Sequence, residues 1–256
     1  MKPKATTRIC HSTADDVFVR GRSLTEELIG RVSFTEMIYL QILGRMPTPG
    51  QTAMLDACLV TLVEHGLTPT AITTRMTYTS APESIQGAVA AGLASVGSLF
   101  VGTVEGCALL LARMVQSEDG EAEAVAIVRE HRDRGARVPG FGHPIHRPDD
   151  PRTPRLLAVA REHGVAGAHV DALETLSAVV DRERGKHLTI NATGAIAATL
   201  ADCDVPAEIL RGIALISRCA GLVGHVREEQ LHPAMNALWE AAEAAVPFEH
   251  TPEEDS

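Results

Sequence analysis

Apolar and polar residues recur with the period of an α-helix along most of the chain, and residues that start or end helices punctuate the pattern. The clearest segment begins at Ser33, where Ser-Phe-Thr-Glu forms a capping box, and ends at Gly44 with Pro47 beyond. Alternation with period two is confined to residues 9–19, which suggest a short ribbon of strands. The same helix signals predict further helices at 49–64, 69–79, 82–99, 104–116, 121–134, 151–163, 170–184, 193–201, 206–226 and 231–245.

Composition narrows the fold class. Aromatic residues make up only 3% of the 256 residues, whereas Ala, Leu, Val and Ile are abundant. The chain is long enough to bury a sizeable interior, and its packing must come from close approach of helices with small side chains. Together with the helical period, this composition predicts an all-α fold.

The formal net charge of -10 bears on partners and location. Such a charge repels phosphate backbones and anionic lipid, so neither nucleic acid nor a membrane is an expected partner. We read no stretch as approaching the roughly 20 apolar residues of a membrane span, and the first residues lack the apolar core of a signal peptide. The five cysteines are widely spaced without a metal-ligand pattern, which indicates buried thiols in a reducing compartment. We therefore expect a cytoplasmic protein.

One polar segment, GFGHPIHRPDDPR at residues 140–152, interrupts the helical pattern. His143 precedes a proline, which disfavours helical geometry and places the histidine on a loop. Asp150-Pro151-Arg152 has the form of a helix start, with Asp150 as N-cap and Pro151 as the first helical residue. Arg152 then lies in the first turn, where its guanidinium adds to the positive end of the helix dipole and suits a carboxylate or phosphate.

Other interpretations of this segment remain open. Glycine and proline also crowd ordinary loops, and a single histidine often has a structural role. The spacing of His143 and His146 fits two zinc ligands on one helix face, but Pro144 argues against a helix and no third ligand is evident. The glycines at 140 and 142 allow the backbone to approach a ligand closely or to adopt positive φ.

The segment resembles the GFGH…DPR element of the citrate synthase family, which includes the citrate-synthase-like module of ATP-citrate lyase. Other motifs agree in order and spacing over essentially the whole chain. They are SFTEMIYLQILGRMPTPGQ with its G-x-x-P turn, EHGLTPTAITTR for DHExNxST, GLASVGSLFVGTVEGCA for GxxSLxGPxHGGA, INATGAIAATL for NVDGxIAxxL, and ISRCAGLVGHVREE for xxRxxGxxAHxxE. Among family members the chain is short and looks like the compact proteins usually labelled citryl-CoA lyase.

The resemblance implies roles for individual residues. His143 matches the histidine that holds the carbonyl or alkoxide of the 2-oxo acid, and His65 matches one that helps bind this acid. Arg152 and Arg218 match the arginines that clamp its carboxylates. The backbone strip that receives the adenine and pantetheine of coenzyme A matches Val138, Pro139, Gly140, Phe141 and Gly142.

Two positions depart from the family pattern. Glu105 replaces the histidine that polarises the thioester carbonyl, and Thr193 replaces the aspartate that takes a proton from the acetyl methyl group. Thr193 can form hydrogen bonds but cannot act as a base near neutral pH. Glu105 can be a base or, if buried, a protonated donor to the thioester oxygen; it can equally be a first-turn glutamate favoured by the helix dipole. With His143 and His65, these two are the candidate catalytic residues.

The resemblance also implies an architecture and an activity. It predicts a large helical domain from 1–107 and 205–256, a small mobile one from 108–204, and a homodimer formed through helices rich in Ala and Gly. The expected activity is a citryl-CoA lyase, which cleaves or forms the bond between an acetyl-CoA unit and a 2-oxo acid such as oxaloacetate. Alternatives are a citrate synthase, a lyase for another 2-hydroxyacyl-CoA, and a non-catalytic CoA-binding homologue. No metal or cofactor is expected, because the coenzyme A thioester is a substrate.

Overall fold

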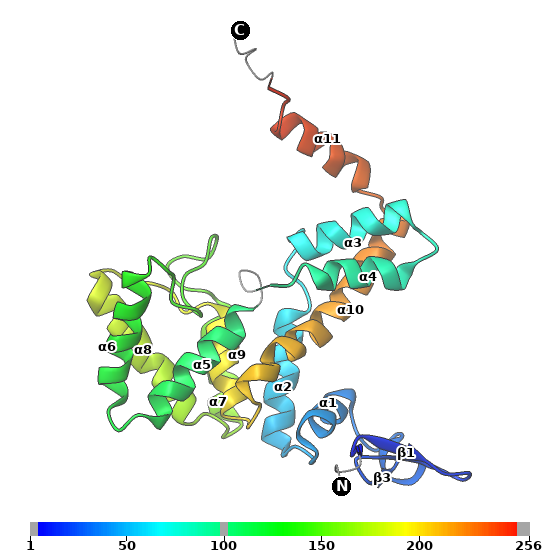
Figure 1. The fold of residues 1–256 in the computed structure, drawn as a ribbon, viewed down its shortest axis with the longest axis horizontal. Helices are drawn as coiled ribbons and strands as arrows, with labels where there is room; N and C mark the ends of the chain where they lie inside the picture. Colours follow the sequence, from blue (N-terminus) through cyan, green and yellow to red (C-terminus); the bar gives the residue numbers. More distant parts are fainter. Residues whose placement is uncertain (1–4, 98–101, 250–256) are drawn as a thin grey trace. The chain divides into compact units, whose positions relative to one another are not determined.

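The computed structural model describes residues 5–97 and 102–249, and it confirms an all-α fold (Figure 1). The chain divides into two compact units, Met1–Thr61 with Val101–Ile213 and Leu62–Phe100 with Ala214–Ser256. We call them unit 1 and unit 2 and describe each by itself. The expected division into a large and a small domain has other boundaries, and it concerns which residues move together, so it stays a prediction.

The helices follow the predicted punctuation closely. Ser33 forms the expected capping box with Glu36, and Gly44 ends the helix in the left-handed conformation at φ 73°. The helices are α1 (Phe34–Leu43), α2 (Pro49–Leu62), α3 (Pro69–Ser80), α4 (Ile85–Ala94), α5 (Thr103–Gln116), α6 (Gly120–Asp133), α7 (Arg152–Glu162), α8 (Ala168–Arg184), α9 (Ala192–Ala201), α10 (Leu210–Leu231) and α11 (Met235–Ala245). The helix expected at 82–99 is shorter, at Ile85–Ala94, and residues 98 and 99 of that prediction lie outside the described part of the chain.

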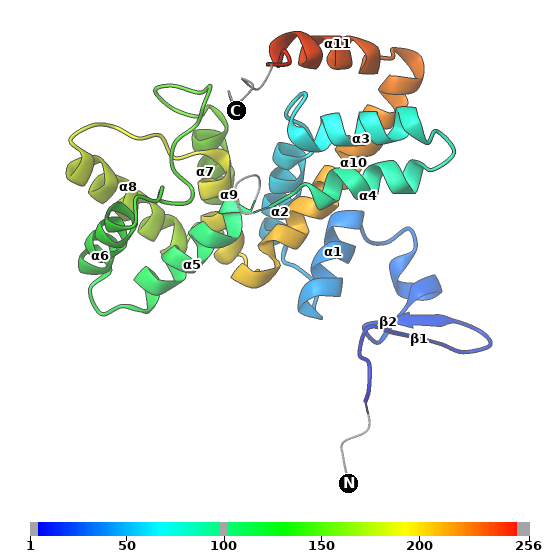
Figure 2. The same cartoon turned by 45° about the horizontal axis from the view of Figure 1, so that its top comes forward.

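The ribbon expected near residues 9–19 is also present. Strands β1 (Cys10–Ser12), β2 (Val17–Val19) and β3 (Arg22–Ser23) form an antiparallel sheet in the order β1-β2-β3. A π-helical turn, η1 (Leu24–Leu28), follows the last strand. Figure 2 shows β1 and β2 side by side, and Val19 packs with Leu28 and Leu40 in a small core cluster.

The core of unit 1 is built around α9. Its sequence, ATGAIAATLA, is apolar or small on every side, and eight of its ten residues are buried. A helix of this kind needs neighbours on all sides. Helices α5, α7 and α8 pack against it, and α6 packs against α5 and α8. This arrangement brings the starts of α5 and α9 next to each other, which matters for the candidate site.

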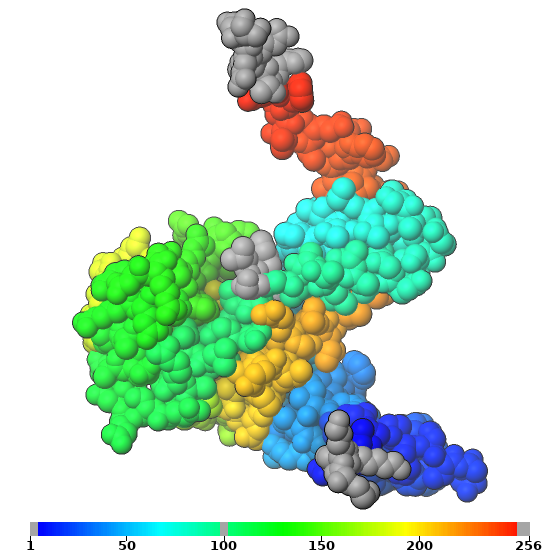
Figure 3. Space-filling view, in the orientation of Figure 1, coloured from blue at the N-terminus to red at the C-terminus, as the bar shows by residue number. Residues whose placement is uncertain are grey.

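Small residues set the packing of unit 2. A Cβ atom added at Gly92 of α4 would lie 1.9 Å from Thr74 Oγ1 of α3, so these two helices touch closely. In the space-filling view, α3 and α4 form one closely packed block (Figure 3). Ala88 and Val89 of α4 and Leu222 and Val226 of α10 form the apolar cluster of this unit. The expectation of close packing between small-residue helices is therefore met here.

The expectation that no stretch of the chain is long and apolar enough for a membrane span is wrong. Ala207–Leu231, which includes the 3-10 turn η2 (Ala207–Ile209) and α10, is 25 residues long. An 18-residue window within it has a mean hydropathy of 1.4, enough for a membrane span by length and composition. A largely buried core helix passes the same test, and 44% of this window is buried. Arg218, His225 and Glu229 are buried along α10. The expected absence of a membrane partner stays a prediction.

Candidate functional site

His143 lies on a loop of unit 1, as the following proline predicted. Its Nδ1 accepts hydrogen bonds from the backbone N–H groups of Ile145 (3.1 Å) and His146 (3.0 Å). A neutral imidazole has one accepting and one donating nitrogen, so these contacts place the ring hydrogen on Nε2. The ring of His146 stacks on that of His143 at 4.3 Å between centroids, and both histidines lie on a loop and not on a helix. His143 is thus built as a hydrogen-bond donor.

Arg152 is held by a buried carboxylate. Asp150 is fully buried, and its two oxygens accept from Arg152 Nε (2.9 Å) and Nη2 (2.7 Å). The same carboxylate accepts from the backbone N–H of Arg152 (3.1 Å) and of Ala192 (3.0 Å). Burial acts to raise the pKa of Asp150, but these hydrogen bonds outweigh it and lower the pKa to about 2. Helix α7 begins at Arg152 with Pro151 as its N-cap, one residue later than expected.

The donors of His143 and Arg152 converge. Arg152 Nη2 lies 3.4 Å from His143 Nε2, and both atoms carry hydrogens in the arrangement described above. Two adjacent donors that cannot bond each other suit an oxygen with negative charge between or beside them. This geometry is compatible with the expected roles of His143 at a carbonyl and Arg152 at a carboxylate.

The strip Val138–Gly142 is fixed through its backbone to residues 189–191. Asn191 N donates to Gly140 O (3.0 Å), Asn191 Nδ2 donates to Gly142 O (2.9 Å), and Gly142 N donates to Thr189 O (2.8 Å). Gly140 has φ 87°, and a Cβ atom there would lie 2.6 Å from Cys107 Sγ. Glycine is therefore required at this position for both conformation and space.

Glu105 is the third residue of α5, and it forms an ion pair that sequence reasoning missed. Its Oε2 lies 2.8 Å from Nη2 of Arg211, and the side chains of Arg211 and Glu105 are 39% and 28% exposed. Glu105 is therefore partly exposed and beside a guanidinium, and its role as a base or a donor stays a prediction. Its neighbour Gly106 faces the strip, because a Cβ atom at Gly106 would lie 3.2 Å from Pro139 Cγ.

Thr193 lies in the first turn of α9, and its hydroxyl is engaged on both sides. It donates to Asn191 Oδ1 at 2.6 Å, so the 2.9 Å contact with Thr103 Oγ1 is one that Thr193 accepts. Asn191 Oδ1 also accepts from Gly194 N and caps the helix. The link between Thr103 and Thr193 joins the starts of α5 and α9. The hydroxyl of Thr193 is therefore part of a hydrogen-bond network between the two helix starts, and a hydroxyl does not act as a base near neutral pH.

His65 and Arg218 belong to unit 2. His65 is exposed, and its backbone N–H donates to Glu64 Oε1 at 2.7 Å. Arg218 is buried, and the nearest carboxylate oxygen is Glu64 Oε1, at 3.8 Å from Nη1. In the described part of the chain, Arg218 Nε and Nη1 are buried without a hydrogen bond. Burial lowers the pKa of Arg218, and Glu64 offsets this only in part.

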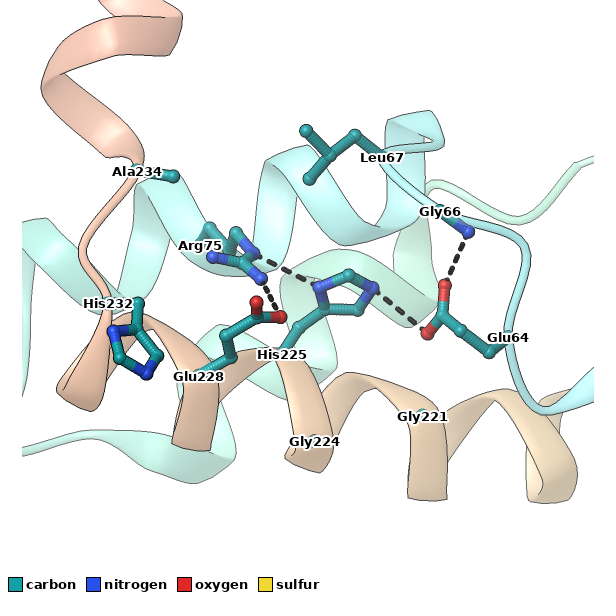
Figure 4. A pocket seen from close by; sticks show the side chains of 10 residues that line it. All are labelled: Glu64, Gly66, Leu67, Arg75, Gly221, Gly224, His225, Glu228, His232 and Ala234. Carbon is teal, nitrogen blue, oxygen red and sulfur yellow. Dashed lines mark hydrogen bonds and ion pairs between the residues drawn. The ribbon is translucent and has the colours of Figure 1, made fainter.

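A pocket of about 630 Å³ lies beside these residues in unit 2 (Figure 4). His225 stands at its centre: Nδ1 accepts from Arg75 Nε at 3.0 Å, and Nε2 lies 2.9 Å from Glu64 Oε2. The latter contact is an ion pair, and Figure 4 marks it with a dashed line. Arg75 is also paired with Glu228 and Glu229.

The predicted site residues are thus divided between the two units. Unit 1 brings together His143, Arg152, the strip Val138–Gly142, Glu105 and Thr193, whereas unit 2 holds His65 and Arg218. Sequence reasoning missed Arg211 and the bond network of Asn191, and it treated Asp150 only as a cap. An Asn-x-Thr-Gly helix start was visible for Asn191. No local signal indicated Arg211, which reaches Glu105 from another helix.

A further histidine ties the loop of His143 to the rest of unit 1. His187 Nδ1 lies 2.7 Å from Asp181 Oδ2, and Nε2 lies 3.0 Å from Asp149 Oδ1. These hydrogen bonds, the one to Asp181 first, raise the pKa of His187. The side chain is 48% exposed, so its contribution to stability is modest.

We expect His187→Gln to lower the melting temperature more at pH 6 than at pH 8.5. A histidine with a raised pKa in the folded state stabilises fully below its unfolded pKa of about 6.5, and this stabilisation is lost as the pH rises through the folded pKa. Thermal unfolding of both proteins across this range measures the difference. A difference that stays constant with pH would contradict the assignment.

The chain is similar to known proteins in both sequence and fold. A family model described as "Citrate synthase, C-terminal domain" matches residues 20–239. The structure of a citryl-CoA lyase from Hydrogenobacter thermophilus is similar at a TM-score of 0.87 and 30% identity, over 98% of this chain and 97% of that one. A citrate synthase of Haloferax volcanii is 26% identical over 190 residues, which are 73% of this chain and 48% of that protein. The chain spans about half the length of the curated relatives it matches.

Proposed function

The chain belongs to the citrate synthase family, and from this premise we propose that it is a citryl-CoA lyase, which cleaves a citryl-CoA-like thioester into acetyl-CoA and a 2-oxo acid such as oxaloacetate. One observation carries the proposal. The citryl-CoA lyase of Hydrogenobacter thermophilus is similar to this chain at a TM-score of 0.87 and 30% identity, whereas the citrate synthases that match are 26 to 28% identical and align over about half of their own length.

The geometry of unit 1 supports the binding of a 2-oxo acid. The Nε2–H of His143 suits the carbonyl oxygen, on which negative charge resides in the alkoxide form. The guanidinium of Arg152 suits a carboxylate. Asp150 keeps this guanidinium in place and accepts from only part of its five N–H donors. Arg218 is the proposed second clamp, since its buried Nε and Nη1 need an acceptor.

The strip Val138–Gly142 is the proposed seat of the coenzyme. Its hydrogen bonds with residues 189–191 hold it in place, and Gly140 lets its backbone pack closely against Cys107 and Gly194. The backbone of the strip turns at Pro139 and Gly140, and we propose that a flat base or a pantetheine chain binds along it. The start of α5 packs directly on the strip, so Glu105 lies close to the proposed thioester.

Cleavage needs one base and one group that stabilises the enolate. A base takes the hydroxyl proton, the alkoxide forms the carbonyl of the 2-oxo acid, and the electron pair of the broken carbon–carbon bond passes to the thioester as an enolate. Protonation of its α-carbon then gives acetyl-CoA. His143 suits the alkoxide as a donor, while the engaged hydroxyl of Thr193 supplies no base for either direction. The reaction and its reverse share one transition state, so the lyase and the synthase differ in whether the citryl thioester is also hydrolysed.

Two assays together test this function. One follows acetyl-CoA released from citryl-CoA, with citramalyl-CoA, malyl-CoA and methylcitryl-CoA as competing substrates. The other follows free citrate and free CoA formed from acetyl-CoA and oxaloacetate. We expect cleavage of citryl-CoA without formation of free CoA. Rapid formation of citrate and CoA would instead identify a synthase, and inactivity in both assays combined with CoA binding by calorimetry would identify a non-catalytic homologue.

The expected partners beyond the substrates remain predictions. They are a homodimer formed through the helices rich in Ala and Gly, no nucleic acid and no membrane. The cytoplasmic location and the absence of a metal or further cofactor are predictions as well.

A further inference from the structure

The ion pair of Glu105 with Arg211 replaces a single histidine of the family pattern with two charged groups. Glu105 occupies the position of that histidine near the start of α5, and Arg211 reaches it from the start of α10. At 2.8 Å, Oε2 of Glu105 and Nη2 of Arg211 form a close contact within unit 1. The pair therefore presents a guanidinium at a place where the sequence alone shows only a carboxylate.

A carboxylate by itself would oppose the proposed reaction. Negative charge develops on the thioester oxygen as the enolate forms, and a nearby anion would raise the energy of that state. Pairing with Arg211 cancels the charge of Glu105. A guanidinium has five N–H donors on three nitrogens, and the closest contact with Glu105 Oε2 is made by Nη2. Arg211 Nε is buried and makes no hydrogen bond within residues 5–97 and 102–249. Donors thus remain for an oxygen of the substrate.

The pair also lies next to the proposed coenzyme seat. Gly106 follows Glu105 directly and contacts Pro139 of the strip so closely that a Cβ atom would lie 3.2 Å from its Cγ. On the next residue, Cys107 Sγ would lie 2.6 Å from a Cβ atom at Gly140. A thioester attached to a coenzyme on this strip passes close to the start of α5.

We infer that Arg211, held by Glu105, is a catalytic residue that stabilises negative charge on the thioester oxygen, and that Glu105 is its positioning residue. The inference rests on the proposed function. In cleavage, the bond between the α-carbon and the carbinol carbon breaks, and its electron pair forms the enolate whose oxygen accepts a hydrogen bond from Arg211. A proton then adds to the α-carbon, and the negative charge leaves the oxygen as the thioester carbonyl is restored. Arg211 itself keeps all its protons.

Infrared spectroscopy of bound [1-13C]acetyl-CoA tests this role directly. Malate at saturating concentration fills the acid site without reacting, because it lacks the ketone. A donor at the thioester oxygen weakens the carbonyl bond, so we expect its stretching frequency to fall on binding to the wild-type protein. Arg211→Gln should abolish the shift and lower citryl-CoA cleavage by a factor of about 100 to 1000, as loss of one oxyanion donor does. Arg211→Lys should retain part of the frequency shift and part of the cleavage rate. Glu105→Gln should reduce the shift and the rate.

Arg113 provides the matched control. It lies on α5, as Glu105 does, and pairs with Glu123 and Glu130 at the surface, so Arg113→Gln should leave the frequency shift and turnover unchanged. Melting temperatures identify any variant that fails to fold. If Arg211→Gln fails to fold, the frequency shift and turnover of Arg211→Lys test the inference instead. A full wild-type shift in folded Arg211→Gln would overturn the inference while the lyase function stands. A wild-type protein that neither binds acetyl-CoA nor cleaves citryl-CoA would overturn both.

Discussion

Asp150→Asn is expected to lower the free energy of unfolding by about 3 kcal/mol and to weaken 2-oxo acid binding, although the two side chains have nearly the same shape. The carboxylate of Asp150 receives four hydrogen bonds, three from Arg152 and one from the backbone of Ala192. All four partners are donors. An asparagine amide directs its own N–H groups at some of them, which leaves buried donors unpaired and Arg152 without its counter-charge.

The effect on binding follows from the position of Arg152. Its Nη2 lies beside His143 Nε2 because Asp150 fixes the guanidinium. Once released, this side chain has to be ordered again when the acid binds, and part of the binding energy is lost. Calorimetry with oxaloacetate and with CoA separates the two ligands, and CoA affinity should change little.

Urea unfolding measures the stability change, and Asp149→Asn is the matched control. Asp149 is adjacent in sequence, its side chain is 64% exposed, and among the described residues its ion pair is with His187, so its replacement should cost less than about 0.5 kcal/mol. The lowered pKa of Asp150, about 2, adds a pH signature. Its stabilisation is complete above the unfolded pKa of about 3.9 and is lost as the pH falls toward 2. Equal free energies of unfolding for the two variants would show that the contacts of Asp150 do not stabilise the fold.

Helix positions were predictable because their signals act within a few residues. The capping box of Ser33 and Glu36 and the left-handed Gly44 mark α1 at both ends. Boundaries slipped where no such signal was present. Helix α10 was expected to end near residue 226 but continues to Leu231, since Arg-Glu-Glu-Gln contains nothing that stops a helix. Pro233 follows shortly after this end, before α11 begins.

Side-chain partners across the fold were not predictable by the same means. Glu105 was visible as a departure from a family motif, but its pairing with Arg211 depends on how α5 and α10 approach each other. The burial of Asp150 depends likewise on the segment 189–192 that packs beside it. Such contacts join residues far apart in sequence, and neither period nor spacing reports them.

Two buried arginines of unit 2 are expected to respond in opposite ways to replacement by methionine. Arg75 is 3% exposed, and its guanidinium contacts Glu228, Glu229 and His225. Arg75→Met would leave buried carboxylate charge without its partner, so we expect a loss of about 4 kcal/mol in the free energy of unfolding. Urea unfolding measures this loss.

Arg218→Met should instead leave the free energy of unfolding unchanged or raise it. Arg218 is 6% exposed, its Nε and Nη1 make no hydrogen bond in the part of the chain that the structure describes, and Glu64 lies 3.8 Å away. A buried charge with so little compensation destabilises the folded protein, and an apolar side chain of similar length removes that cost. A protein retains such an arginine when a ligand supplies the missing acceptor.

The same variant should bind the 2-oxo acid at least about 30-fold more weakly, because loss of one partner of a desolvated charge pair costs about 2 kcal/mol or more. Calorimetry with oxaloacetate and with CoA measures the change, and the affinity for CoA should be preserved. Stability that rises while acid affinity falls would identify Arg218 as a residue kept for binding. If Arg218→Met unfolds as readily as Arg75→Met, the guanidinium has a structural partner instead, and the second clamp of the acid must be sought elsewhere in the chain.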